Sequence, residues 1–295
     1  MNPSHHVNTE IDTEIPKRPA RVLLGWLEAD EAGLWLAEQQ AGVQPTATQL
    51  AQAAHARAVV AARVPGVDQS EVVTALPEEL SGYVQRLEQT RDFADMLREG
   101  FRPAMADLTK LCALQPYVYT DHTMARVAML DVGDLAAIAE MTLPMPSVTP
   151  PPTIHFDEAT QSWVLPATNP NLRIIGPFNA ELEPSGHAFG FIVGVTTSFL
   201  QVSSFNGRYF LRDGYHRAYG LLARGIKQVP VMLRDCATPE EFCPPPGMLA
   251  PEVCLGERPP RLPDYLDNRV SGAVDMAGSR KLVVIHGSER NFIPQ

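Results

Sequence analysis

The residues best suited to chemistry are Asp-Gly-Tyr-His-Arg at positions 213–217, directly preceded by Arg212. They follow a strand-like run and begin a helix-like run. The first amides of a helix have no intrahelical acceptor, and the helix dipole places partial positive charge there. Gly214 lets the backbone approach a ligand, while His216 and Arg217 add donors. The pattern predicts a site for a phosphate or carboxylate.

The same residues also have a purely structural interpretation. Asp213 could cap the helix, with Gly214 easing the turn. His216 could be a core histidine, and Arg217 could pair with an acid. Strand–glycine–helix turns commonly connect elements without any binding role, so both interpretations stay open from the sequence alone.

The charge distribution marks this stretch as unusual. The 295-residue chain carries a formal net charge of -10, and residues 1–150 hold 20 acids against 11 bases. Such a balance argues against general affinity for DNA, RNA or anionic lipid. It leaves the acidic half as an expected surface for a protein partner. Residues 205–235 reverse the balance, with these bases facing only two acids: Arg208, Arg212, Arg217, Arg224, Lys227 and Arg234.

Local signals predict the elements that position the turn. Asn206-Gly207 lies between the strand-like runs 199–205 and 208–212, and Asn-Gly is a strong hairpin signal because both residues tolerate positive φ. A helix is expected over 215–224, ended by Gly225 at its C-terminal cap. Residues 229–233 then read as a buried strand.

With its helix and closing strand, this stretch resembles the core of the ParB/sulfiredoxin-like superfamily. The residues are FLRDGYHRAYGLLARGIKQVPVML, and the resemblance covers roughly positions 199–235. It implies nucleotide binding, with triphosphate oxygens at the helix N-terminus and the His-Arg pair, and a nucleoside triphosphate with Mg²⁺ as cofactor. Members include nucleotide-dependent partition proteins, sulfinic acid reductases and kinases. Tyr215 stands where sulfiredoxin carries its catalytic cysteine, so that thiol chemistry is not expected.

The expected fold class is α+β, a helical N-terminal half followed by a small mixed sheet and a proline-rich C-terminal arm. Helices are expected over 20–40, 46–62, 77–98, 105–114 and 132–141. The sheet region should contain a hairpin of 154–156 with 162–165, strands at 172–175 and 189–195, and a last strand at 281–285. Five regions follow: a disordered lead 1–19, a helical region 20–143, a proline-rich linker 144–152, the α/β core 153–235 and an extended tail 236–295.

Several other chemistries lack a motif. There is no P-loop and no G-x-G-x-x-G turn, no nucleophile elbow and no cysteine spacing typical of zinc. No secretory signal or membrane span is visible, which favours a cytoplasmic protein. The sequence therefore predicts a nucleotide- or phosphate-binding protein whose reaction is unknown. The alternative is a non-catalytic interaction module in which the turn is structural.

Overall fold

The computed structural model describes most of the chain. Outside the described residues lie 1–15, 38–43, 148–149, 151, 168, 170, 185, 243–246, 279–280 and 289–295. Most of the expected disordered lead therefore falls outside them, and its last residues, from Lys17, belong to a strand. The division into five regions stays a prediction.

A six-stranded mixed sheet forms the centre of the molecule, in the order β2-β3-β12-β10-β11-β4. Strand β12 runs parallel to β10 and β4 runs parallel to β11, while the remaining neighbours are antiparallel. The bounds are β2 Val73–Thr74, β3 Arg102–Asp107, β4 Cys112–Ala113, β10 Gln201–Phe205, β11 Arg208–Asp213 and β12 Gln228–Asp235.

The local predictions around the turn are confirmed. Strands β10 and β11 form the expected hairpin, with Asn206 and Gly207 both at positive φ. Helix α7 spans Tyr215–Ala223, and Gly225 follows at a φ of 81°. Helix α5 (Asp121–Val127) packs against α7 at Gly220, where a Cβ would lie 2.5 Å from the Thr123 side chain. Glycine thus permits the close approach of the two helices.

The N-terminal half is not purely helical, and this part of the expected fold is wrong. The expected helix over 105–114 is absent: residues 105–107 belong to β3, which pairs with β12, and residues 112–113 form β4, which pairs with β11. A short apolar run buried on both faces does not distinguish strand from helix. The helices of this half are η1 Leu24–Trp26, α1 Ala29–Leu36, α2 Ala47–Ala61, η2 Glu78–Leu80, α3 Ser81–Glu88, α4 Arg91–Arg98, α5 and α6 Leu135–Thr142.

The C-terminal tail, residues 236–295, also contains more regular structure than the extended chain expected from the sequence. Its strand β13 (Gly272–Ala277) pairs with β1 (Lys17–Val22), which in turn pairs with β5 (Tyr117–Tyr119). Residues 20–22, expected to begin a helix, therefore belong to a sheet whose partner strand lies some 250 positions away. The tail also contains α8 Pro239–Phe242, α9 Pro251–Cys254 and η3 Leu262–Leu266.

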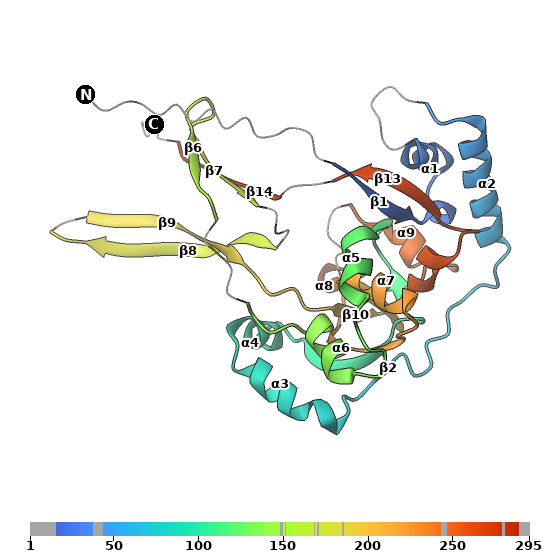
Figure 1. Cartoon of the computed structure of the whole chain (residues 1–295), viewed down its shortest axis with the longest axis horizontal. Coiled ribbons are helices and arrows are strands. Elements are labelled where there is room, and N and C mark those ends of the chain that lie inside the picture. Colours follow the sequence, from blue (N-terminus) through green and yellow to red (C-terminus); the bar gives the residue numbers. More distant parts are fainter. Residues whose placement is uncertain are drawn as a thin grey trace.

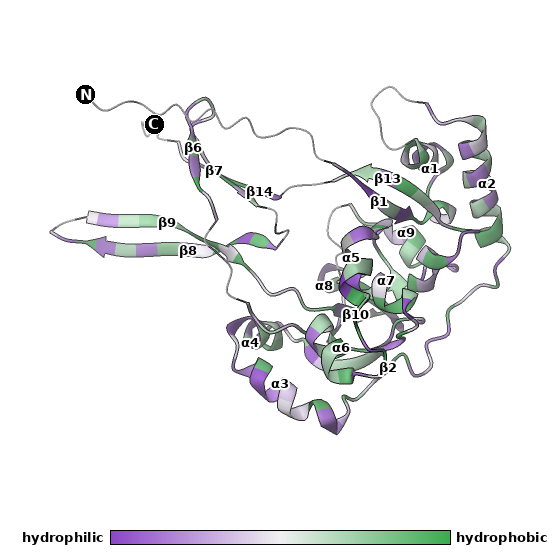
Figure 2. Ribbon diagram, viewed as in Figure 1, coloured by the Kyte–Doolittle hydropathy of each residue, from purple (hydrophilic) through white to green (hydrophobic). Residues whose placement is uncertain are grey.

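Two smaller sheets lie to one side of this body (Figure 1). The predicted hairpin of β6 (His155–Asp157) with β7 (Ser162–Ala167) is confirmed, and β14 (Lys281–His286) adds to it. Strands β8 (Leu172–Leu182) and β9 (Gly186–Val195) form a long hairpin that projects away from the body (Figure 1). We call this hairpin the arm; hydrophobic residues alternate with hydrophilic ones along both of its strands (Figure 2).

Candidate functional site

The turn between β11 and α7 is built around Gly214. Its φ of 94° lies in the left-handed region that favours glycine. The Asp213 carboxylate accepts hydrogen bonds from the Gly214 amide at 2.6 Å and from the Ser198 hydroxyl at 3.2 Å. Asp213 therefore orders the turn and ties it to the segment between β9 and β10.

Tyr215 faces the core rather than a ligand. Its hydroxyl accepts a hydrogen bond from the Leu114 amide at 2.7 Å and donates to the Leu211 carbonyl. Only 3% of the residue is exposed, and burial raises the pKa of its phenol well above the ordinary value. Tyr215 anchors the first turn of α7 to the central sheet.

Arg217 is held by groups of the protein itself. Its guanidinium donates to the Ser198 carbonyl at 2.7 Å, the Ser198 hydroxyl at 3.0 Å and the Met141 carbonyl at 3.1 Å. Burial is the main cause that lowers the pKa of Arg217 to about 10, and the nearby Asp213 opposes this shift. The side chain joins α6, the turn and the segment before β10.

His216 supplies a neutral imidazole. Burial, with a smaller contribution from the Arg18 charge, lowers the pKa of His216 to about 4. Its Nδ1 is buried and has no hydrogen-bond partner among the described residues. The ring lies 5.7 Å from that of Tyr119, centroid to centroid. At neutral pH, His216 therefore offers a hydrogen-bonding nitrogen and no positive charge.

Two cavities meet at this turn. The first has a volume of about 620 Å³ and is lined by Arg212. The second has a volume of about 920 Å³ and is lined by His216 and Arg217. Both share Asp213, residues 196–198 and Arg173, which lies near the start of β8. The start of the arm and the segment that follows it therefore contribute to the walls of both cavities.

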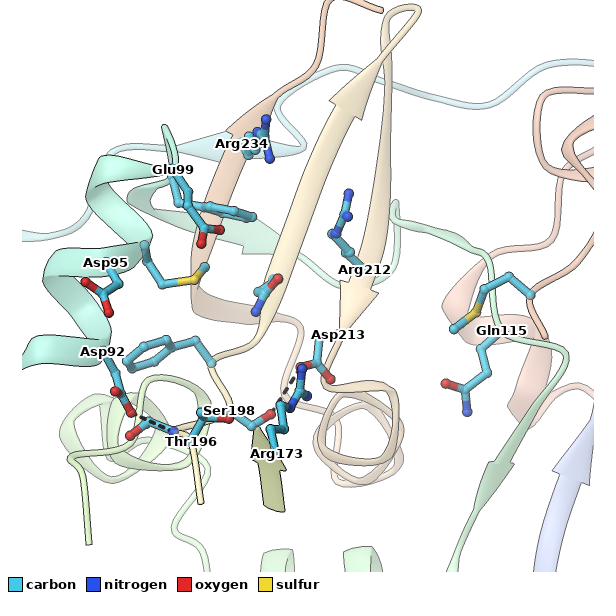
Figure 3. Close-up of a pocket in the computed structure, with 16 residues that line it drawn as sticks. Asp92, Asp95, Glu99, Gln115, Arg173, Thr196, Ser198, Arg212, Asp213 and Arg234 are labelled. Atoms are coloured by element: carbon cyan, nitrogen blue, oxygen red, sulfur yellow. Dashed lines mark hydrogen bonds between the residues drawn. The ribbon is translucent and has the colours of Figure 1, made fainter. Parts of the chain in front are cut away.

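Three arginines gather in the first cavity. Arg212 lies at an irregularity of β11, because Asp213 pairs with Gln201 while Leu211 pairs with the next residue of β10. Such bulges redirect a side chain. Arg234 comes from β12, and Arg173 lies beside Ser198 and Asp213 in Figure 3. Within the described part of the chain, none of these three arginines forms an ion pair.

Most of the acids in the first cavity already have partners. Asp92 of α4 accepts a hydrogen bond from the Thr197 amide at 2.7 Å. Asp95 pairs with Arg91 and Arg98 on its own helix. Figure 3 shows these carboxylates along α4, on the side of the cavity opposite the strands that carry Arg212 and Arg234. Among the described residues, the three guanidinium groups thus lack an acidic partner, whereas Asp92 and Asp95 each already have a polar contact.

The structure therefore divides the residues predicted from the sequence. Arg212 lines the first cavity, His216 and Arg217 line the second, and Asp213 lines both, whereas Gly214 lines neither. Arg173 lines both cavities but was not predicted from the sequence. No local pattern marks it, since it becomes part of the site only through the path of the arm. Arg234 belongs to the basic stretch already visible in the sequence.

The described residues contain no group of three or more histidine, cysteine, aspartate or glutamate side chains arranged to hold a metal ion. In the same residues, no helix has the length and apolar character needed to cross a membrane. Comparison with known proteins gave no match to a family model, a curated protein or a solved structure.

Proposed function

We propose that this chain binds a phosphate-bearing ligand, with a nucleoside triphosphate as the ligand class, in the cavity lined by Arg173, Arg212 and Arg234. One observation carries the proposal: three guanidinium groups without an acidic partner in the described chain line a single cavity. A guanidinium presents a planar fork of donors that matches phosphate oxygens. Three such groups offset much of the charge of a triphosphate.

The size and lining of the cavity suit this ligand class. Small-molecule sites commonly enclose about 300–1,000 Å³, and this cavity has about 620 Å³. Its wall includes Phe101, Phe199 and Met248 besides the charged groups. Because Phe101 and Phe199 are only 5% and 1% exposed, the base would lie against Met248, while the arginines receive the phosphates.

A magnesium ion accompanying the phosphates would find carboxylates at the edge of the same cavity. Mg²⁺ usually takes one or two protein carboxylates and completes its shell with water and phosphate oxygens. Asp213 and Asp92 both line this cavity and are the carboxylates that we assign to that role. The ion would reduce the repulsion among the phosphates. Because both carboxylates already accept hydrogen bonds, we assign them no part in proton transfer.

A second candidate function is that of a non-catalytic interaction module with a structural turn. The contacts of Arg217 and Tyr215 favour it, because both side chains donate hydrogen bonds to backbone carbonyls of the protein. In this case the cavity arginines would be surface charges, and nucleotides would not bind.

The experiment is a thermal-shift and calorimetric titration with ATP, CTP, GTP and inorganic phosphate, each with and without Mg²⁺. We expect at least one nucleotide to raise the melting temperature of the wild-type protein. Arg212→Ala and Arg234→Ala should each weaken binding about tenfold or more, as expected for a lost charge-assisted hydrogen bond. Arg57→Ala removes an exposed arginine of α2 and serves as the control, with unchanged binding.

Two results would count against this function. Absence of stabilisation by every nucleotide would exclude the proposed ligand class and favour the interaction module. Equal affinity of the wild type and both cavity variants would show that the ligand binds elsewhere.

A further inference from the structure

The second cavity of the site has walls of its own, beyond the residues that it shares with the first. Its volume of about 920 Å³ lies within the range typical of small-molecule sites. Figure 3 shows three residues of the shared wall, Arg173, Ser198 and Asp213, close together. The other walls come from α5 through Arg126, from residues 144–147 after α6, and from the chain before β8. Elements distant in the sequence therefore enclose this cavity.

The charges of the second cavity favour a ligand with a single negative charge. Three arginines and two aspartates line it, and His216 is neutral at pH 7, so its formal charge is one positive unit. Arg217 already donates to carbonyl oxygens of the protein. Within the described part of the chain, the side chains of Arg126 and Arg173 form neither an ion pair nor a hydrogen bond. These two guanidinium groups are thus available to a ligand carboxylate, whose two oxygens match the guanidinium fork.

Uncharged hydrogen-bonding groups make up much of the remaining wall. The side-chain oxygen of Asn169 accepts a hydrogen bond from the Asn171 backbone amide at 3.0 Å, and its Nδ2 donates to no described residue. The side-chain amide of Asn171 and the hydroxyl of Thr197 also have no partner among the described residues. All three residues are half-buried. Amides and hydroxyls both donate and accept hydrogen bonds, so these groups suit the hydroxyl groups of a ligand.

We propose that the second cavity binds a small monocarboxylate that carries several hydroxyl groups, a sugar acid. Its carboxylate binds Arg126 and Arg173, and its hydroxyl groups bind Asn169, Asn171 and Thr197. A phosphate dianion would exceed the single positive charge of this cavity, and uncompensated charge is costly away from water. The site itself does not depend on a nucleotide. Only the link between the two ligands through Arg173, which lines both cavities, rests on the function proposed above.

Calorimetric titration of the full chain tests the ligand class with matched probes. Gluconate carries both the carboxylate and the hydroxyl groups, sorbitol carries the hydroxyl groups alone, and hexanoate carries the carboxylate alone. We expect gluconate to bind about tenfold or more tightly than either of the others, as for a lost hydrogen bond to a charged group. Absence of saturable gluconate binding overturns the proposal, and so does equal affinity for sorbitol or for hexanoate.

Two arginine variants then locate the site, because Arg126 lines only the second cavity and Arg234 only the first. Arg126→Ala should weaken gluconate binding about tenfold and leave ATP binding unchanged, whereas Arg234→Ala should do the reverse. Arg126 is exposed, so its variant should fold like the wild type.

Arg173→Ala should weaken the binding of both ligands, because this residue lines both cavities. Gluconate affinity that Arg126→Ala leaves unchanged, or that Arg234→Ala reduces equally, overturns the assignment of the sugar acid to the second cavity. ATP that fails to bind contradicts the proposed function alone, since gluconate binding lost in Arg126→Ala would still support the second site.

Discussion

Arg212 and Arg217 stand on opposite sides of one turn and carry the same charge, yet the fold uses them differently. Arg217 points inward and donates to three acceptors of the protein. Arg212 lies at the strand irregularity with a single long contact, 3.4 Å to the Phe242 carbonyl, and lines a cavity with Arg173 and Arg234. A cation in a binding motif is therefore not by itself a ligand contact. Whether such a cation can bind a ligand depends on how many of its hydrogen-bond donors are already bound to acceptors of the protein.

The largest effect should separate these two arginines by stability. Arg217→Met removes the donor from the Ser198 and Met141 carbonyls, and we expect a loss of about 3 kcal/mol in the free energy of unfolding. Arg212→Met should change it by less than about 0.5 kcal/mol, as for a surface substitution. Urea unfolding measures both values. Equal losses of unfolding free energy in the two variants would contradict the different roles of Arg217 and Arg212.

A smaller loss of stability is expected from a change at Gly214, the backbone position between Arg212 and Arg217. Gly214→Ala places a Cβ at a φ of 94°, where it would lie 3.0 Å from the Leu200 side chain and 3.2 Å from the Arg217 guanidinium. We expect a loss of about 1–2 kcal/mol in the free energy of unfolding. Gly207→Ala, also at positive φ but with open space around its Cβ, is the control and should cost less. A larger loss at Gly207 would contradict the crowding at Gly214.

The smallest effect concerns the proton of His216. Its folded pKa of about 4 lies below the usual 6.5, so between these values the unfolded chain binds more protons and stability rises with pH. Above pH 6.5 the contribution is fully present, and it is lost as pH falls toward 4. His216→Gln should flatten the pH dependence of the unfolding free energy by up to about one proton in this window. Parallel curves for both proteins would show that His216 is not held neutral.

The arm is connected directly to the first cavity. Arg173 belongs to β8 and residues 196–198 follow β9, so the arm and the first cavity share structure. The cavity wall thus combines segments that the sequence alone keeps apart from the turn.

Elements that depend on neighbouring residues could be predicted from the sequence. The Asn206-Gly207 hairpin, the turn at Gly214, helix α7 and its end at Gly225 all follow from backbone preferences that act over a few positions. The β6–β7 hairpin was predictable for the same reason. The resemblance to the ParB/sulfiredoxin-like core and the nucleotide it implies stay predictions.

Elements and contacts that depend on distant segments could be identified only in the folded protein. Residues 105–107 are a strand because β12 pairs with them, and residues 17–22 are a strand because β13, near the other end of the chain, does so. Arg173 joins Arg212 only through the folding of the arm, and Arg217 is occupied only because Ser198 and Met141 come within hydrogen-bonding distance. Local propensity carries no information about such contacts, because the pairing partner sets both the element and the free donors that remain.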